Sequence, residues 1–257
     1  MNATYIYCLA QSPEPPSLEG APPGLAGTAP LRLLQLSGDV WVVAADAPLP
    51  DYGGDAIESR LSDLSWVSDR AMAHERVVEH FGARGPVLPM KLFTLFTGDE
   101  RALAHLRERL PGIEQAFART AGRAEWGVRI LFQEERARRE AAEAATRTDG
   151  DGGGRGFLLR KKAAQESART LSGKVRDEVD RAFADLAERA AEVRRREPET
   201  ESAAARLLLD AAFLVPHGDA GEFERAVQGW ADRLAGQACE VTLTGPWPPY
   251  NFIAEPA

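Results

Sequence analysis

The residue types that do acid–base or metal chemistry are few in this sequence and lie far apart. Its four histidines are His74, His80, His105 and His217. The closest two are six residues apart, which places them on different faces of a helix, whereas a zinc clamp needs its ligands on one face. Neither a two-histidine metal site nor a cysteine site can therefore be built locally.

Two groupings of chemically capable side chains occur near His74: the set Ser65, Ser68, Asp69 and His74, and the pair Glu75 and Glu79. No nucleophile-elbow sequence surrounds either serine, so a catalytic triad has no local support. The two glutamates lie one helical turn apart, and Arg76 beside them is typical of a solvated helix face. We interpret both groupings as helix surface and expect no catalytic residues.

Residues 148–156 form the most glycine-rich stretch, with the sequence Thr-Asp-Gly-Asp-Gly-Gly-Gly-Arg-Gly. A phosphate-binding loop would end in Lys-Ser or Lys-Thr, and a dinucleotide site would follow a Gly-x-Gly-x-x-Gly register. This stretch does neither, and its composition is typical of a flexible linker. We therefore expect no bound cofactor here.

Three large rings near the C-terminus, Trp247, Tyr250 and Phe252, are separated by Pro248 and Pro249. The prolines restrict the backbone, so the rings are carried on a stiff segment. Two interpretations stay open. The rings form a partner-binding patch, or they fold back over the C-terminal sheet or the domain boundary.

Composition excludes several classes of protein. The chain has 257 residues, of which 44% are hydrophobic, so it can fill one large core or two ordinary ones. Its net charge of −8 argues against general nucleic-acid binding. No stretch reaches the ~20 apolar residues that span a bilayer, and no secretory leader is evident, so we expect a cytoplasmic protein. Cys8 and Cys239 fit buried free thiols, and a disulfide between them stays open.

The first half of the chain mixes strands and helices without strict alternation. Strand patterns cover 4–9, 31–36 and 40–45, and a strand-like run with two prolines covers 85–96. Helical spacing covers 57–81 and 99–110, and it resumes after Pro111-Gly112 to near Thr120. The connection 12–30 is rich in proline and glycine and should hold no regular element. Thr97 and Glu100 match a capping box at the start of a helix. We predict an N-terminal α+β domain over residues 1–122.

The second half predicts a domain over residues 123–257. Strand patterns cover 125–132, 206–215 and 239–244, and helical patterns cover 133–147 and 222–234. A long amphipathic helix is expected over 157–196. If residues near 192–197 add a strand, the order becomes βαββαβ, which is ferredoxin-like. The fold class is thus α+β, in two domains.

Several short motifs, taken in chain order, resemble those of the gas vesicle proteins of the GvpF/GvpL type. The motifs are Tyr5-Ile6-Tyr7, Gly38-Asp39-Val40-Trp41-Val42-Val43, His74-Glu75-Arg76-Val77-Val78, Val87-Leu88-Pro89-Met90, Gly156-Phe157-Leu158-Leu159-Arg160, Ala211-Ala212-Phe213-Leu214-Val215 and Leu243-Thr244-Gly245-Pro246-Trp247-Pro248-Pro249-Tyr250-Asn251-Phe252. They span nearly the whole chain. One departure is Lys91-Leu92-Phe93-Thr94, where the family tends to show an aromatic-glycine-threonine run, so the local backbone path is an open question.

The resemblance implies a non-enzymatic, minor structural or accessory protein of gas vesicles, the hollow protein-walled organelles that provide buoyancy. Its expected partners are the small hydrophobic shell protein and other accessory gas vesicle proteins, and its expected place is the gas vesicle within the cytoplasm. The resemblance also implies an α+β N-terminal domain and a modified ferredoxin-like C-terminal domain. Trp247, Tyr250 and Phe252 are the candidate partner-binding residues.

Two other classes of function stay open. A ferredoxin-like sheet can carry a small-molecule-binding regulatory or enzymatic domain, because fold alone does not decide function. A deep pocket with converging polar groups favours that class, whereas a broad apolar or charged groove favours the assembly role. An adaptor that holds several accessory proteins together differs from the assembly factor only in its partners.

Overall fold

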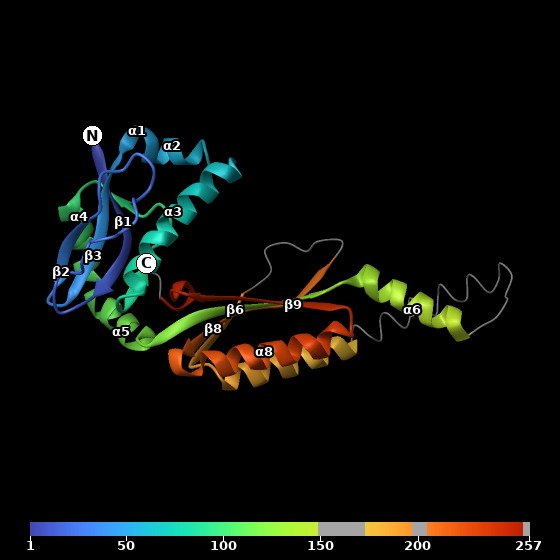
Figure 1. The fold of residues 1–257 in the computed structure, drawn as a ribbon. Coiled ribbons are helices and arrows are strands. Elements are labelled where there is room, and N and C mark those ends of the chain that lie inside the picture. The colour runs from blue at the N-terminus through green and yellow to red at the C-terminus, as the bar shows by residue number, and fades with distance from the viewer. Residues whose placement is uncertain (149–172, 197–204, 254–257) are drawn as a thin grey trace. The chain divides into compact units, whose positions relative to one another are not determined.

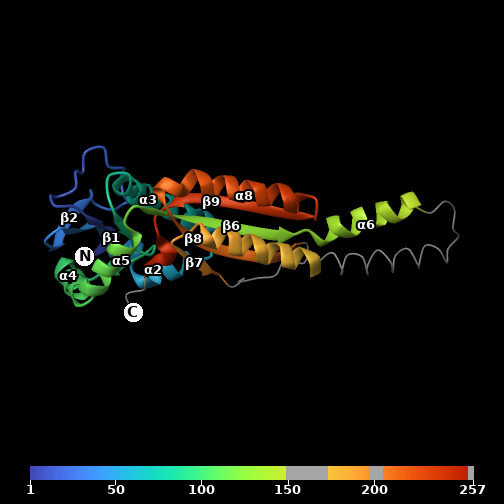
Figure 2. The same ribbon diagram turned by 90° about the horizontal axis from the view of Figure 1, so that it is seen from below.

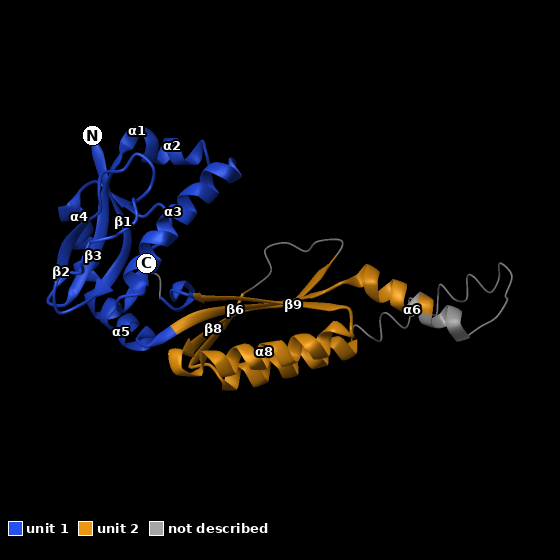
Figure 3. Cartoon of the chain, viewed as in Figure 1, with its two compact units in different colours: residues 1–123, 247–257 blue, residues 124–246 orange. Residues whose placement is uncertain are grey.

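The computed structural model describes residues 1–148, 173–196 and 205–253, and these form two compact units. Unit 1 comprises residues 1–123 together with the C-terminal segment from residue 247, and unit 2 comprises residues 124–246 (Figure 3). Each unit has its own hydrophobic core. The described part of the chain contains no helix that is long and apolar enough to cross a membrane.

Unit 1 is an antiparallel sheet with helices on both faces (Figure 1). Its strands are β1 (Asn2–Gln11), β2 (Arg32–Ser37), β3 (Val40–Pro48), β4 (Val87–Pro89) and β5 (Leu95–Phe96). Its helices are α1 (Leu49–Tyr52), α2 (Gly54–Glu58), α3 (Leu64–Gly82), α4 (Asp99–Glu108) and α5 (Leu110–Thr120), followed near the C-terminus by the short 3-10 helix η2 (Tyr250–Phe252). The strand order is β2-β3-β1-β4, and β5 also pairs with β1.

Strand β1 lies inside the sheet and is buried on both faces. Tyr5 and Tyr7 pack with α3 residues in one core cluster, while Ile6 and Leu9 pack with residues of α4 and α5 in another. The pairing of β1 with β3 shifts register between Ile6 and Cys8, so that Tyr7 is an extra residue in β1. This bulge puts Tyr7 and Cys8 in the same core cluster, although neighbouring residues of a regular strand point to opposite faces.

The helix starts in unit 1 differ in how they are capped. Asp63 caps α3, because its carboxylate accepts a hydrogen bond from the Trp66 amide at 3.1 Å. The predicted capping box at Thr97 and Glu100 is wrong: the N-cap of α4 is Gly98, and no side chain caps it. Asp99 and Glu100 lie in the first turn instead, where their negative charges interact favourably with the positive end of the helix dipole.

Unit 2 has the predicted βαββαβ order. Its elements are β6 (Arg123–Phe132), α6 (Glu134–Thr148), a helix described over 173–188, β7 (Glu192–Arg195), β8 (Arg206–Pro216), the 3-10 turn η1 (His217–Asp219), α8 (Ala220–Ala235) and β9 (Cys239–Trp247). The strand order β7-β8-β6-β9 confirms the ferredoxin-like expectation. The predicted long helix 157–196 is described only from residue 173, and the glycine-rich stretch lies outside the described residues from position 149.

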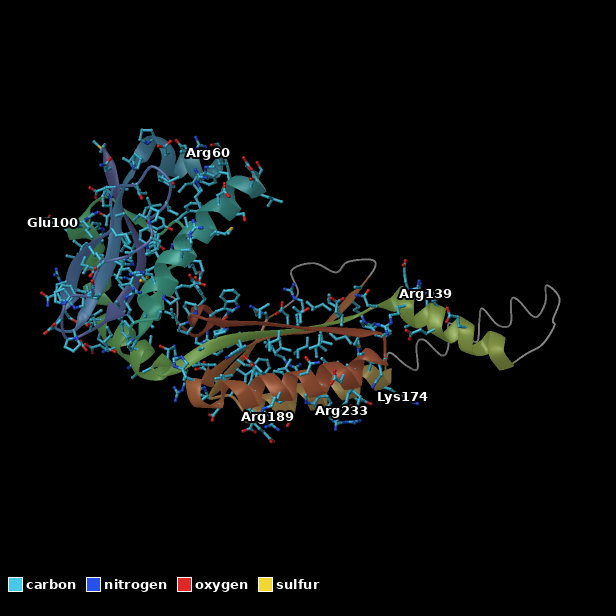
Figure 4. All side chains as sticks on the ribbon, in the orientation of Figure 1. Arg60, Glu100, Arg139, Lys174, Arg189 and Arg233 are labelled. Carbon is cyan, nitrogen blue, oxygen red and sulfur yellow. The ribbon has the colours of Figure 1, made fainter. Side chains whose placement is uncertain are left out.

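Helix α8 and the helix over 173–188 pack side by side on one face of the unit 2 sheet (Figures 1 and 2). Val175, Val179, Ala182 and Leu186 follow the predicted helical spacing and join one buried cluster with residues of β6, β8 and α8. Val193, which the sequence pattern assigned to the same helix, belongs to β7. Arg189 and Arg233 project away from the sheet (Figure 4), so the outer helical face is charged.

Strand β9 continues to Trp247, through the Gly245-Pro246 pair at which the sequence pattern ended it. Gly245 has a φ of +121°, and a Cβ there would lie 2.7 Å from the Glu125 carbonyl oxygen. Only glycine fits at position 245, because any side chain there would clash with the backbone of β6.

The backbone at Phe93 keeps the path that a glycine would take. Its φ is +66°, in the left-handed region that favours glycine. Two contacts hold it there: its amide donates to the Tyr5 hydroxyl at 3.3 Å, and its ring stacks on Trp66 with centroids 5.5 Å apart. Phenylalanine thus takes a left-handed path that suits glycine, at a local conformational cost.

We predict that Phe93→Gly is more stable than Phe93→Ala by about 1 kcal/mol, because both variants lose the ring but only alanine keeps the left-handed strain. Chemical denaturation of both proteins measures the difference. A higher stability for the alanine variant would contradict a left-handed residue 93.

Candidate functional site: a groove along helix α3

A cavity of the described residues forms a groove between α3 and the connection that follows β1. Its volume is about 900 Å³. Its lining residues are Leu18, Ala21, Pro22, Pro23, Gly24, Leu25, Ala26, Gly27, Thr28, Ala29, Pro30 and Leu31 from the connection, and Asp69, Arg70, Met72, Ala73 and Arg76 from α3. The connection supplies uncharged residues throughout, so every charged side chain of the groove stands on the helix.

The inner face of α3 is fixed to the sheet by apolar packing. Ala73, Val77, Val78 and Phe81 are buried in the cluster that contains Tyr5 and Tyr7. These positions recur at helical spacing, as a helix that covers a sheet requires. The outer face of α3 is therefore directed away from the sheet, and Met72 on it is 58% exposed.

The connection between β1 and β2 forms the second wall, and side-chain hydroxyls hold it in place. The Leu25 amide donates to the Tyr7 hydroxyl at 2.8 Å, and the Tyr52 hydroxyl donates to the Ala26 carbonyl at 2.6 Å. Leu25 itself is buried. A Cβ at Gly24 would lie 2.1 Å from the Tyr7 hydroxyl, so this close approach requires glycine.

A buried hydrogen-bonded chain lies beneath the groove. The Tyr5 hydroxyl and His74 Nδ1 are 2.7 Å apart, and His74 Nε2 lies 3.0 Å from the Met90 carbonyl oxygen. A carbonyl only accepts, so Nε2 donates to it and Nδ1 accepts from Tyr5. Burial lowers the pKa of His74 to about 4, and the Met90 carbonyl opposes that shift. His74 is therefore a neutral structural link between α3, β1 and the segment after β4.

The candidate catalytic groupings are not assembled into a site. Ser65, Ser68 and Asp69 are exposed on α3 while His74 is buried, so helix geometry separates them. Of the two carboxylates, Glu75 accepts a hydrogen bond from Tyr250 and Glu79 is exposed.

The described residues also hold no cluster suited to metal binding, and their two cysteines are not reactive thiolates. Within residues 1–148, 173–196 and 205–253, no three His, Cys, Asp or Glu side chains form a cluster that could hold a metal ion. Cys8 and Cys239 are both free and buried, and burial raises the pKa of the Cys239 thiol to about 11. Both thiols are therefore protonated at neutral pH.

The structure divides the three C-terminal rings. Phe252 is fully buried, Tyr250 is partly buried, and Trp247 is 40% exposed. The Tyr250 hydroxyl donates to Glu75 of α3 at 2.6 Å, and Arg119 of α5 donates to the Phe252 carbonyl. Burial raises the pKa of Tyr250, and the Glu75 carboxylate raises it further.

The C-terminal segment is thus part of unit 1, whereas the sequence assigned it to the second domain. The physical reason is that α3 and α5 supply partners for its polar groups, and Ile253 packs against the core beside α5. Two of the three rings consequently anchor the segment, and Trp247 is the one with substantial free surface.

A second group of charged side chains surrounds Arg32 on β2, the edge strand of the unit 1 sheet. Arg32 pairs with Asp46 at 2.7 Å and with Asp99 at 2.5 Å, and Thr4 donates to Asp99 at 2.6 Å. Burial opposes the charged form of Asp99, but the hydrogen bonds from Arg32 and Thr4 outweigh it and lower its pKa. The arrangement ties β1, β2 and β3 to the start of α4, and each of its charged groups has an ion-pair partner within it.

Comparison with known proteins identifies the family. The family model described as "Gas vesicle synthesis protein GvpL/GvpF" matches residues 3–254. The chain belongs to this family.

Curated relatives of the family align with the chain over most of their length. Gas vesicle protein L from Streptomyces sp. (strain CB03234) is 29% identical over 260 residues, which cover 98% of this chain and 93% of that protein. Gas vesicle protein F from the same strain is 27% identical over 264 residues, covering 98% and 99%.

Solved structures of relatives share the fold. The crystal structure of GvpF from Anabaena sp. PCC7120 superimposes with a TM-score of 0.71 at 19% identity, covering 99% of this chain and 97% of that one. GvpF from Microcystis aeruginosa gives 0.68 at 17% identity, covering 98% and 99%. The predicted family and the α+β fold class are confirmed.

The groove is the feature that sequence reasoning missed. One wall is the proline- and glycine-rich connection 12–30, which the sequence pattern described only as irregular. The other wall is α3 with Met72, which lies within the predicted helical region 57–81. An irregular segment and a helix face give no sign in sequence that they oppose each other.

We predict that stability falls as pH is lowered from about 6.5 to 4. The unfolded His74 binds a proton near its ordinary pKa of 6.5, whereas the folded side chain binds it only near pH 4. The unfolded state therefore binds more protons in that window, which lowers the unfolding free energy by up to about 3 kcal/mol. Above pH 6.5 the contribution of His74 to stability is fully present.

Urea denaturation of the wild type and of His74→Gln across pH 7.5 to 4.5 measures this effect. Glutamine keeps a donor and an acceptor but does not titrate, so the pH slope of this variant should be smaller. Equal slopes in the two proteins would show that His74 does not carry the effect.

Proposed function

We propose that this protein is a non-catalytic accessory factor of gas vesicle formation, and that its groove takes an apolar segment of the hydrophobic shell protein. By covering that segment it promotes nucleation or assembly of the shell. The observation that carries the proposal is the groove itself, about 900 Å³ in volume, with an uncharged proline-rich wall facing α3.

The exposed side chains of unit 1 support a protein partner. Met72 is 58% exposed and Leu18 is 38% exposed, and both line the groove. Leu64, two helical turns before Met72 on α3, is 80% exposed. Methionine is adaptable and recurs at surfaces that bind apolar helices. A patch of this kind beside charged residues is typical of a protein interaction site.

Charge position limits the orientation of the bound segment. Asp69 and Arg76 stand on either side of Met72 along α3, and both line the groove. A segment with an apolar centre, a basic residue near Asp69 and an acidic residue near Arg76 would satisfy both charges. We propose that Trp247, through its exposed surface, adds a further contact, while Tyr250 and Phe252 hold its segment on unit 1.

The alternative of a small-molecule-binding or enzymatic domain has less support. Such a site is usually concave, with a few polar groups that converge on the ligand. Here the charged groups lie along one wall only, and the opposite wall is uncharged. An adaptor role differs in its partner, so the same groove would then bind another accessory gas vesicle protein.

The direct test substitutes the centre of the groove. Met72→Lys puts a charge among apolar walls at an exposed position, so we predict a normal fold and at least about a tenfold loss of shell-protein binding. Met72→Leu keeps the apolar surface and serves as the matched control. Co-purification from a gas vesicle-forming host, with each variant replacing the native gene, measures binding, and electron microscopy counts the vesicles.

Loss of shell-protein binding and of vesicles in Met72→Lys alone would support the proposal. Loss of an accessory protein with the shell protein retained would favour the adaptor. Unchanged binding and vesicle number in Met72→Lys would contradict a role for the groove.

A further inference from the structure

Among the described residues, strand β9 is an edge of the unit 2 sheet, and its own sequence carries little of the usual protection of an edge. In the order β7-β8-β6-β9, no described strand pairs with its outer side. Between Cys239 and Gly245 it carries one charge, Glu240, and no lysine, arginine or proline. Free edges normally carry charges, prolines or bulges that prevent pairing with another chain.

The other edge of the same sheet shows the contrast. Strand β7 has only four residues, and Glu192, Arg194 and Arg195 are charged. Short length and charge both discourage strand addition at β7. The protection is thus present at one edge of the sheet and missing at the other.

The register of β9 shows which backbone groups point outward. The Gln133 amide donates to the Ala238 carbonyl at 2.8 Å, and Thr244 lies against Gly127, so β6 and β9 run antiparallel. Hydrogen bonding alternates along such a pair. Ala238, just before β9, bonds to Gln133, just after β6. By this alternation, the amides and carbonyls of Cys239, Val241, Leu243 and Gly245 point to the free edge.

We propose that β9 pairs antiparallel with β9 of a second copy of this chain, about a two-fold axis at Thr242. In that register Val241 faces Leu243 of the other copy, and Cys239 faces Gly245. Every outward amide then meets an outward carbonyl from residue 239 to 245. Pro246, which has no amide hydrogen, ends the pairing.

The side chains of β9 are self-complementary in the same register. Val241 and Leu243 are partly buried against the core of unit 2 and meet each other across the axis. On the opposite face, Glu240, Thr242 and Thr244 are exposed. Glu240 meets Thr244, and Thr242 meets Thr242, a favourable cross-strand pair, so no like charges oppose each other. A register centred on Glu240 would place two carboxylates together.

The pairing joins the two unit 2 sheets into one continuous sheet, and each dimer then carries two copies of unit 1. Two binding units on one particle raise the effective affinity for a surface built from repeated subunits. The dimer itself does not depend on what the groove binds, so its test is independent of the proposed function.

The test uses opposite charges at the two-fold axis in the full-length protein. Thr242→Lys and Thr242→Asp each place like charges opposite each other in a homodimer, so each should weaken self-association by about tenfold or more. An equimolar mixture of the two variants places Lys opposite Asp and should dimerise again. Gln115→Lys adds the same charge on exposed α5 and should leave the dimer unchanged.

Analytical ultracentrifugation across the micromolar range, with circular dichroism to verify folding, measures the outcome. A dimeric wild type, weakened single variants and a restored mixture would support the pairing. A monomeric wild type, or a mixture that stays monomeric, would overturn it. So would dimers that persist in both variants.

Discussion

The hydroxyl groups of Tyr5 and Tyr7 impose the constraint on which unit 1 depends. Both side chains are fully buried on β1, and a buried hydroxyl without a partner costs about 1 to 3 kcal/mol. Tyr5 finds His74 of α3, and Tyr7 finds the Leu25 amide of the irregular connection. The need of each buried hydroxyl for a partner thus fixes both α3 and the connection that follows β1 on the same face of the sheet. The groove is the space that these two elements leave between them.

This origin explains how a loop can serve as a binding wall. Irregular segments are usually more mobile than the elements they connect. Here hydroxyls of Tyr7 and Tyr52 hold the connection, and Gly24 permits the closest approach. A wall held in this way loses little conformational freedom when a partner binds. The net charge of −8 opposes self-association through such a surface, because copies of the chain repel each other.

The sequence predicted the parts of the fold that depend on local periodicity. Runs of apolar and β-branched residues indicated β1, β3 and β6. Helical spacing indicated α3 and α8, because that pattern follows from burial of one helix face. The bulge at Tyr7 was not predicted, because a single extra residue in a strand leaves no mark in composition. The sequence showed that the run Lys91-Leu92-Phe93-Thr94 departs from the family pattern. Only the φ of Phe93 in the structure showed that its backbone is left-handed, as a glycine's can be. The docking of Tyr250 on Glu75, 175 residues away in sequence, rests on a tertiary hydrogen bond that no local pattern reveals.

Hydrogen–deuterium exchange on the full-length protein, alone and bound to the shell protein, shows whether the partner lies between α3 and the connection that follows β1. We expect slower exchange in residues 18–31 and in α3, with little change in α8 on the second unit. Slower exchange confined to other segments, with residues 18–31 and α3 unchanged, would contradict it.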